Sequence, residues 1–332
     1  MSQEVSIPNP NTRAVAIVPG EQVQVEAVKS RKVLHLLLIA MRPHQWIKNL
    51  FILTPLLFGK KLLDPFAAGH ALLAFASFCL MCSALYIIND IIDAPEDRAH
   101  PDKRFRPIAS GALTIPVALG ASLALSAIAF WIASTIGGGF FLLALTYFGL
   151  TLGYCVRFKQ AMILDCMIIA TGFVLRVVSG AVAVDIEPTH WLIACAFLLA
   201  LYLAFAKRRQ ELLMLSAEAG KHRNVLDKYT VGYLDQVNNI LIGATIVCYA
   251  LYTVAPDTVA RFHTDKLIYG SVFVIYGLLR YIALTRDPSN GGNPSKMLTK
   301  DKPLMLTVLG WATYNAVIIY SPSILEMYNR LK

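Results

Sequence analysis

Residues 66–111 read FAAGHALLAFASFCLMCSALYIIND and then, without a break, IIDAPEDRAHPDKRFRPIASG. The first part is a predominantly apolar run that is long enough for a helix to cross a bilayer, which takes ~20 residues. The second part is dense in acidic and basic side chains, which are costly inside a membrane and belong where such a helix meets water. The stretch therefore predicts a membrane-spanning helix that ends in a charged site.

Three acidic residues in this stretch, Asp90, Asp93 and Asp97, recur at i, i+3 and i+7 and share one face if the helix continues. Crowded carboxylates repel one another unless a cation lies among them. Oxygen ligands shared with the phosphates of a substrate are typical of Mg²⁺. The remaining phosphate charge would be met by the basic residues that follow, Lys103, Arg104 and Arg106. The interpretation is a Mg²⁺–diphosphate site at a membrane surface.

The composition agrees with a membrane protein. Of 332 residues, 56% are hydrophobic and 15% are charged, whereas soluble domains carry about 25% charged residues. Residues 1–30 differ from the rest because they are polar and rich in proline, so we expect a disordered cytoplasmic tail before one membrane domain at 31–332. We expect no nucleic-acid partner.

The apolar pattern predicts an all-α bundle, since helices are the form in which such long apolar segments span a bilayer. The expected segments are 44–60, 66–89, 114–135, 139–157, 162–183, 190–207, 237–256, 265–285 and 304–321. Basic residues are concentrated in the loops after the second, fourth, sixth and eighth segments. By the positive-inside rule, these loops and the N-terminus face the cytoplasm of a multi-pass plasma membrane protein.

A second polar group falls at the same face. Its members end the fourth segment or lie inside the fifth, and they are Tyr154, Arg157, Lys159, Asp165 and Arg176. Ionisable residues within a span are functional candidates that face the bundle interior. The alternatives are a structural ion pair or a charge that snorkels to the interface. Lys48 and Asn49, in the first segment, are candidates for the mouth of the site.

These motifs resemble the UbiA superfamily of intramembrane prenyltransferases over about residues 35–325. The likeness rests on Asn89-Asp90-x-x-Asp93-x-x-x-Asp97, on Arg106-Pro107-Ile108-x-Ser110-Gly111 and on Arg42-Pro43-His44-Gln45-Trp46-Ile47-Lys48-Asn49. The resemblance implies nine transmembrane helices around a central cavity. Tyr154-x₄-Lys159-x₅-Asp165 replaces the more usual second D-x-x-x-D. With that replacement, the motifs resemble those of one branch of the superfamily. Enzymes of that branch transfer the phosphoribosyl group of phosphoribosyl pyrophosphate (PRPP) to decaprenyl (polyprenyl) phosphate, a step toward arabinan.

The resemblance implies that Asp90, Asp93 and Asp97, helped by Asn89, hold Mg²⁺ on the diphosphate, and that Asp165 serves the second motif. The attacking phosphate is already anionic, so no histidine is assigned to catalysis. Pro95 lies inside the first motif and predicts a bend or an end of the helix there. The alternatives are prenyl transfer to an aromatic or quinone-precursor acceptor and, in a different class, a transporter or lipid-binding membrane protein.

Overall fold

The computed structural model describes residues 32–100, 102–215, 226–286, 297 and 300–331. The tail predicted at residues 1–30 lies outside the described residues. Within the described part, regular secondary structure is entirely helical, which confirms the predicted all-α class. Eight helices there are long and apolar enough to cross a membrane.

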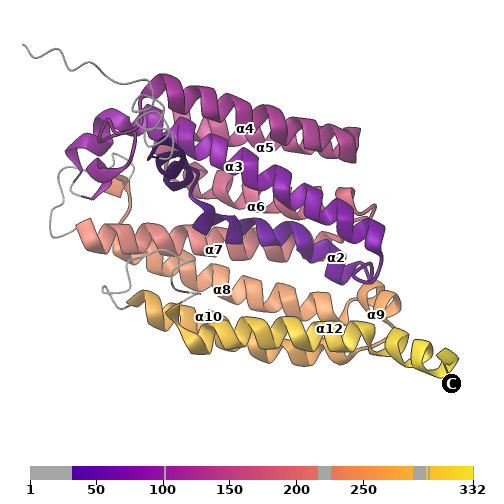
Figure 1. Cartoon of the computed structure of the whole chain (residues 1–332). Coiled ribbons are helices and arrows are strands. Elements are labelled where there is room, and N and C mark those ends of the chain that lie inside the picture. The colour runs from indigo at the N-terminus through magenta and orange to yellow at the C-terminus, as the bar shows by residue number, and fades with distance from the viewer. Residues whose placement is uncertain (1–31, 101, 216–225, 287–296, 298–299, 332) are drawn as a thin grey trace, which may run out of the picture.

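The long helices lie side by side in one bundle, with α4 and α5 along one edge and α10 and α12 along the other (Figure 1). Their bounds are α3 Pro65–Ala99, α4 Ile115–Ile136, α5 Gly138–Val156, α6 Leu164–Ala183, α7 His190–Leu215, α8 Val231–Val254, α10 Ser271–Arg286 and α12 Lys302–Leu331. The shorter elements between them are η2 Lys103–Phe105, η3 Phe158–Gln160, η4 Leu226–Lys228, α9 Pro256–Phe262 and η5 Lys266–Gly270. Most of these bounds fall close to the predicted segments.

The first predicted segment, 44–60, is a broken element. A short helix, Lys32–Met41, precedes it, and the chain then turns at Arg42, whose φ is 53°. The segment itself is a 3₁₀ helix, η1 (Pro43–Leu53), followed by α2 (Thr54–Phe58). It packs tightly on α6, where a Cβ at Gly180 would lie 2.0 Å from the Ile52 carbonyl oxygen. Glycine is therefore required at this crossing.

Helix α3 is longer than its apolar run. Its first turn is capped by Asp64, whose carboxylate accepts from the backbone N–H groups of Phe66 and Ala67. It then continues through Pro95 as far as Ala99, so the end predicted at the proline does not occur. Its 35 residues correspond to about 52 Å at 1.5 Å per residue. The hydrocarbon core of a bilayer is about 30 Å thick, so α3 carries the acidic motif beyond that core.

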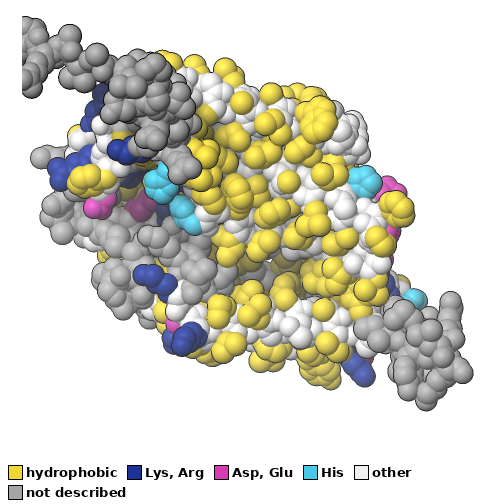
Figure 2. Space-filling model, viewed as in Figure 1, with side chains coloured by type: hydrophobic (Ala, Val, Ile, Leu, Met, Phe, Trp, Pro, Cys, Tyr) yellow, Lys and Arg dark blue, Asp and Glu magenta, His cyan; other side chains and the backbone are white. Residues whose placement is uncertain are grey.

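Two apolar clusters share α6. One joins η1, α3, α4, α5 and α6, and the other joins α6, α7, α8, α10 and α12. Figure 2 shows an apolar band around the middle of the bundle, with Lys and Arg side chains gathered at the end where α3 terminates. Helix α6 is thus the shared wall between two half-bundles.

Candidate active site

A cavity of about 2080 Å³ enters the bundle from this charged end. Polar side chains from η1, α3, η3 and α7 line its outer part, and aliphatic and aromatic side chains from α6, α7, α8, α10 and α12 line the rest. A single chamber therefore joins a charged mouth to an apolar interior.

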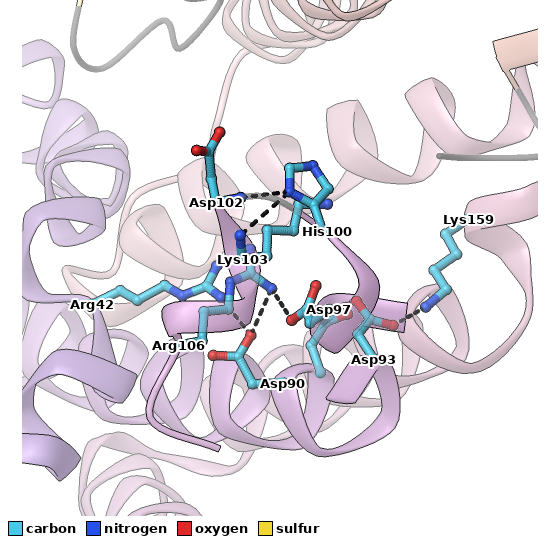
Figure 3. A network of polar contacts seen from close by, with 10 residues as sticks. Arg42, Asp90, Asp93, Asp97, His100, Asp102, Lys103, Arg106 and Lys159 are labelled. Atoms are coloured by element: carbon cyan, nitrogen blue, oxygen red, sulfur yellow. Dashed lines mark hydrogen bonds and ion pairs between the residues drawn. The ribbon is translucent and has the colours of Figure 1, made fainter. Parts of the chain in front are cut away.

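Asp90 and Asp97 lie together at the mouth, although Pro95 separates them in sequence (Figure 3). Both carboxylates are buried. Arg106 Nη1 donates to Asp97 Oδ2 at 2.6 Å and to Asp90 Oδ1 at 3.2 Å. Arg42 forms a second ion pair with Asp90. The two carboxylates thus share their counter-charges on one face of α3, as the i, i+7 spacing predicts.

Asp93 lies on the neighbouring side of the same helix and pairs with Lys159, which η3 brings across (Figure 3). Asn89 Nδ2 donates to Asp93 Oδ2 at 2.9 Å, one turn away. Lys159 thereby connects the Asp93 side of α3 to the Tyr154-x₄-Lys159 sequence. The loop after α3 is ordered by His100, whose Nδ1 accepts from the backbone N–H groups of Asp102 and Lys103.

The donor set for a divalent cation is chemically suitable, because three carboxylates and one amide oxygen line one part of the cavity. Within the described residues, however, no three acidic, histidine or cysteine side chains converge closely enough to hold a metal ion. Each of the three carboxylates is instead bonded to a basic side chain. The acidic groups fit a metal that arrives with an anion able to take over those basic partners.

Asp165 belongs to a separate buried network. It is 0% exposed, and its carboxylate accepts from Arg208 Nε at 2.7 Å and from the Tyr229 hydroxyl at 3.1 Å. Burial raises the pKa of Tyr229, so the phenol keeps the proton that it donates. Arg208 also donates to the Tyr154 hydroxyl at 3.2 Å. Asp165 does not line the cavity, whereas Arg208 does.

A third polar cluster lies deeper, around Arg176. Its guanidinium donates to Asn49 Oδ1 at 2.9 Å, to the Gly172 carbonyl at 2.9 Å and to the Tyr147 hydroxyl at 2.6 Å. All three acceptors are uncharged. Arg176 is only 6% exposed, yet it lines the cavity. The sequence places Asp165 and Arg176 on nearly the same face of α6, but the structure gives each its own partners.

The predicted residues therefore separate into two groups. Those that line the cavity are Lys48, Asn89, Asp90, Asp93, Asp97, Lys103, Arg106, Tyr154, Lys159 and Arg176. Those that do not line it are Asn49, Arg104, Arg157 and Asp165. Arg104 stacks over the ring of Phe105, and Arg157 is exposed. Asn49 is bonded to Arg176 and Asp165 to Arg208, and both arginines line the cavity.

Sequence reasoning missed Arg42 and Arg208 as site residues. Both were counted among the basic residues of the cytoplasmic face, where a positive charge needs no further explanation. The available signals were the position of Arg42 at the start of a motif and the position of Arg208 inside a helix, next to an apolar run. Neither signal identifies the carboxylate to which each arginine bonds.

Comparison with known proteins identifies the family. The profile of the UbiA prenyltransferase family matches residues 52–300. The chain belongs to the UbiA family. A UbiA homolog from Archaeoglobus fulgidus, solved with GPP and Mg²⁺ bound, has the same fold, with a TM-score of 0.66 and 21% identity. That alignment covers 86% of this chain and 99% of the homolog.

Two curated relatives of this UbiA family member are named decaprenyl-phosphate phosphoribosyltransferase. The protein from Mycolicibacterium smegmatis is 33% identical over 91% of this chain and 98% of its own length. The protein from Corynebacterium glutamicum is 33% identical over 85% of this chain and 86% of its own length. The similarity therefore extends over nearly the whole membrane domain.

Proposed function

We propose that this protein transfers the 5-phosphoribosyl group of PRPP to a polyprenyl phosphate. An oxygen of the lipid phosphate attacks the anomeric carbon, and the bond from that carbon to pyrophosphate breaks. Pyrophosphate leaves with the electron pair. The attacking oxygen is already anionic near neutral pH, so no general base is required. The names of the two relatives support this chemistry.

The observation that carries the proposal is the pairing of acidic and basic residues at the cavity mouth. The reaction brings together a diphosphate, a 5-phosphate and a lipid phosphate, so it needs several cations as well as a metal site. Arg42, Arg106 and Lys159 line the cavity and are held in place by the carboxylates. Arginine forks match phosphate oxygens in pairs, and lysine acts as a point charge.

We assign the metal as Mg²⁺ and its ligands as Asp90, Asp93 and Asp97, with Asn89 as a neutral oxygen partner. Mg²⁺ would act as a Lewis acid that offsets the charge on the departing pyrophosphate. The side chains of the protein bind the donor and position it. Arg42, Arg106 and Lys159 bind phosphate oxygens and orient the donor.

The proposed orientation places the charged mouth and the N-terminus in the cytoplasm of a plasma membrane, where a soluble phosphorylated donor is available. The basic loops at this end support that orientation. The product would be a lipid-linked pentose phosphate, a precursor for arabinan or a related glycan.

The second candidate is prenyl transfer from a polyprenyl diphosphate to an aromatic acceptor. It is favoured by the fold shared with a homolog solved with GPP and Mg²⁺. It is disfavoured by the second motif, which offers only one carboxylate. That carboxylate, Asp165, is bonded to Arg208 and does not line the cavity. Transport is disfavoured because the charged residues lie at one end of the bundle, whereas transporter sites lie near the midplane.

The test is product formation by purified protein in detergent. With Mg²⁺, labelled PRPP and a polyprenyl phosphate, the protein should make a labelled lipid and release pyrophosphate. The matched reaction contains polyprenyl diphosphate and 4-hydroxybenzoate, and we expect no product from it. Prenylated 4-hydroxybenzoate without labelled lipid would establish the second candidate, and no product in either reaction would reject both.

A further inference from the structure

Two cavity-lining basic residues, Lys48 and Arg176, have no acidic partner among the described residues. Four other cavity-lining basic residues each pair with an acid: Arg42 with Asp90, Arg106 with Asp97, Lys159 with Asp93, and Arg208 with Asp165. Arg176 bonds only neutral groups.

An uncompensated buried charge is costly unless a partner of opposite charge completes the site. Lys48 and Arg176 are linked through chain neighbours, because Asn49 accepts the 2.9 Å hydrogen bond from Arg176 Nε. Both cations line the same cavity, and together they define its positively charged part. An anionic ligand would supply the missing counter-charge.

The depth of this positively charged part follows from α3. Arg176 Nη2 lies 3.5 Å from Cys82 Sγ, and Cys82 lies eight residues before Asp90, or about 12 Å along the helix. From Pro65, where the apolar band begins, Cys82 is about 26 Å along α3. The hydrocarbon core is about 30 Å thick. Arg176 is therefore close to its far edge, while the acidic motif lies beyond it.

We infer that Lys48 and Arg176 form a binding site for a phosphate monoester, and that its natural ligand is the phosphate of the polyprenyl acceptor. This inference rests on the proposed function for the identity of the acceptor. The phosphate group of a membrane lipid lies at the edge of the hydrocarbon core, the depth at which Arg176 is found. A soluble donor entering from water meets the Asp90–Asp97 face first.

The surroundings favour the lipid over the 5-phosphate of PRPP as the source of the phosphate. The guanidinium of Arg176 lies 5.1 Å from the Phe173 ring centroid and 4.7 Å from that of Tyr147. Phe173 packs edge-on against Phe51 at 5.2 Å. Apolar side chains such as Val177 and Leu199 continue the cavity wall. A polyprenyl chain attached to the bound phosphate would have this apolar wall beside it.

The experiment measures ligand binding to the full chain in detergent, without Mg²⁺ or PRPP. The probes are farnesyl phosphate, farnesol and ribose 5-phosphate, titrated by calorimetry. Lys48→Met removes the charge and keeps the length of a side chain for which the described structure shows no hydrogen bond. Because the removed charge has no acidic partner, the thermal midpoint of the variant should equal or exceed the wild-type value. Lys266→Met, at an exposed position away from the cavity, is the matched control.

Lys48→Met should weaken farnesyl phosphate binding by about ten- to hundredfold, the usual loss for one charge-assisted contact. Farnesol binding should not change, and the control should bind farnesyl phosphate normally. Unchanged farnesyl phosphate binding in Lys48→Met would overturn the site. An equal or larger loss for ribose 5-phosphate would assign the site to the donor and overturn the acceptor assignment. Lysine-dependent binding of farnesyl phosphate by a protein that does not use PRPP would uphold the site and reject the proposed function alone.

Discussion

Arg208 Nε lies 2.7 Å from Asp165 Oδ2, and the two residues are 1% and 0% exposed. This buried ion pair joins α6 to α7 and presents Arg208, rather than Asp165, to the cavity. We therefore predict that the second motif of this family member acts through a guanidinium. In that prediction Asp165 is a positioning residue, because its carboxylate accepts hydrogen bonds from Arg208 and Tyr229 and does not line the cavity.

Replacing Asp165 with alanine should destabilise the protein and reduce turnover together. Loss of one partner of a buried ion pair costs about 3–5 kcal/mol, because it leaves an uncompensated charge. Asp165→Asn keeps the shape and should cost less, but should still lower the catalytic rate and weaken PRPP binding. Thermal unfolding in detergent and steady-state kinetics test both variants. The matched control is Asp235→Asn, because the carboxylate of Asp235 pairs with Arg209 but is half-exposed. A stability loss in this control as large as that of Asp165→Asn would contradict the argument.

Replacing Asp90 or Asp93 with alanine should reduce turnover by at least about hundredfold, the usual loss when one group that stabilises developing charge is removed. Asp97→Ala should be equally severe, because α3 continues through Pro95 and Arg106 bonds Asp97 and Asp90 together. Initial rates at saturating PRPP and polyprenyl phosphate provide the measurement, with the thermal midpoint as the check on folding. Near-normal turnover in any of the three variants would remove that residue from the site.

Lys159→Ala should raise the Michaelis constant for PRPP more than that for the lipid. Lys159 lines the cavity mouth and pairs with Asp93, on the side where a soluble donor enters. A lost charge-assisted contact to phosphate costs about 1.5–3 kcal/mol, or roughly ten- to hundredfold in binding. Arg157→Ala is the comparison, because Arg157 is exposed and outside the cavity lining. A rise in the Michaelis constant for the lipid alone would assign Lys159 to acceptor binding.

The topology predicts which positions are accessible from outside intact cells. A cysteine at Glu187, in the acidic loop between α6 and α7, should react with a membrane-impermeant maleimide, and a cysteine at Ser110 should not. Both positions are exposed. Five of the six native cysteines are buried and the sixth is half-buried, so background labelling should be low. Labelling at Ser110 from outside would reverse the orientation and place the charged mouth away from the cytoplasm.

Long apolar segments and the acidic motif were predictable because each depends on residues close together in the sequence. The C-terminal end of α3 and the N-terminal end of α8 were not predictable in this way. Helix α3 continues ten residues past its predicted end at 89, and α8 begins six residues before its predicted start at 237. In both places polar residues ended the apolar pattern although the backbone remained helical.

The partners of the acidic residues could not be read from the sequence. Asp90 and Arg42 are 48 residues apart, and Asp165 and Arg208 are 43 apart, so nothing local connects them. Periodicity places Asp165 and Arg176 on one face of α6, but it cannot tell which neighbouring helix supplies a partner for each. Such contacts depend on how η1, η3 and α7 pack around α3 and α6.

The saturation of Asp90, Asp93 and Asp97 by Arg42, Arg106 and Lys159 has a thermodynamic consequence. A divalent cation alone would have to displace a basic side chain and leave it unmatched, and a diphosphate alone would meet carboxylates of its own sign. When both bind, the cation can pair with the carboxylates and the diphosphate with the basic side chains. We therefore expect positive, reciprocal coupling, in which Mg²⁺ tightens PRPP binding by the same factor as PRPP tightens Mg²⁺ binding. Titration of each ligand in the presence and in the absence of the other measures that factor. If the affinity for one ligand does not depend on the other, the ion pairs at the mouth stay closed when the ligands bind.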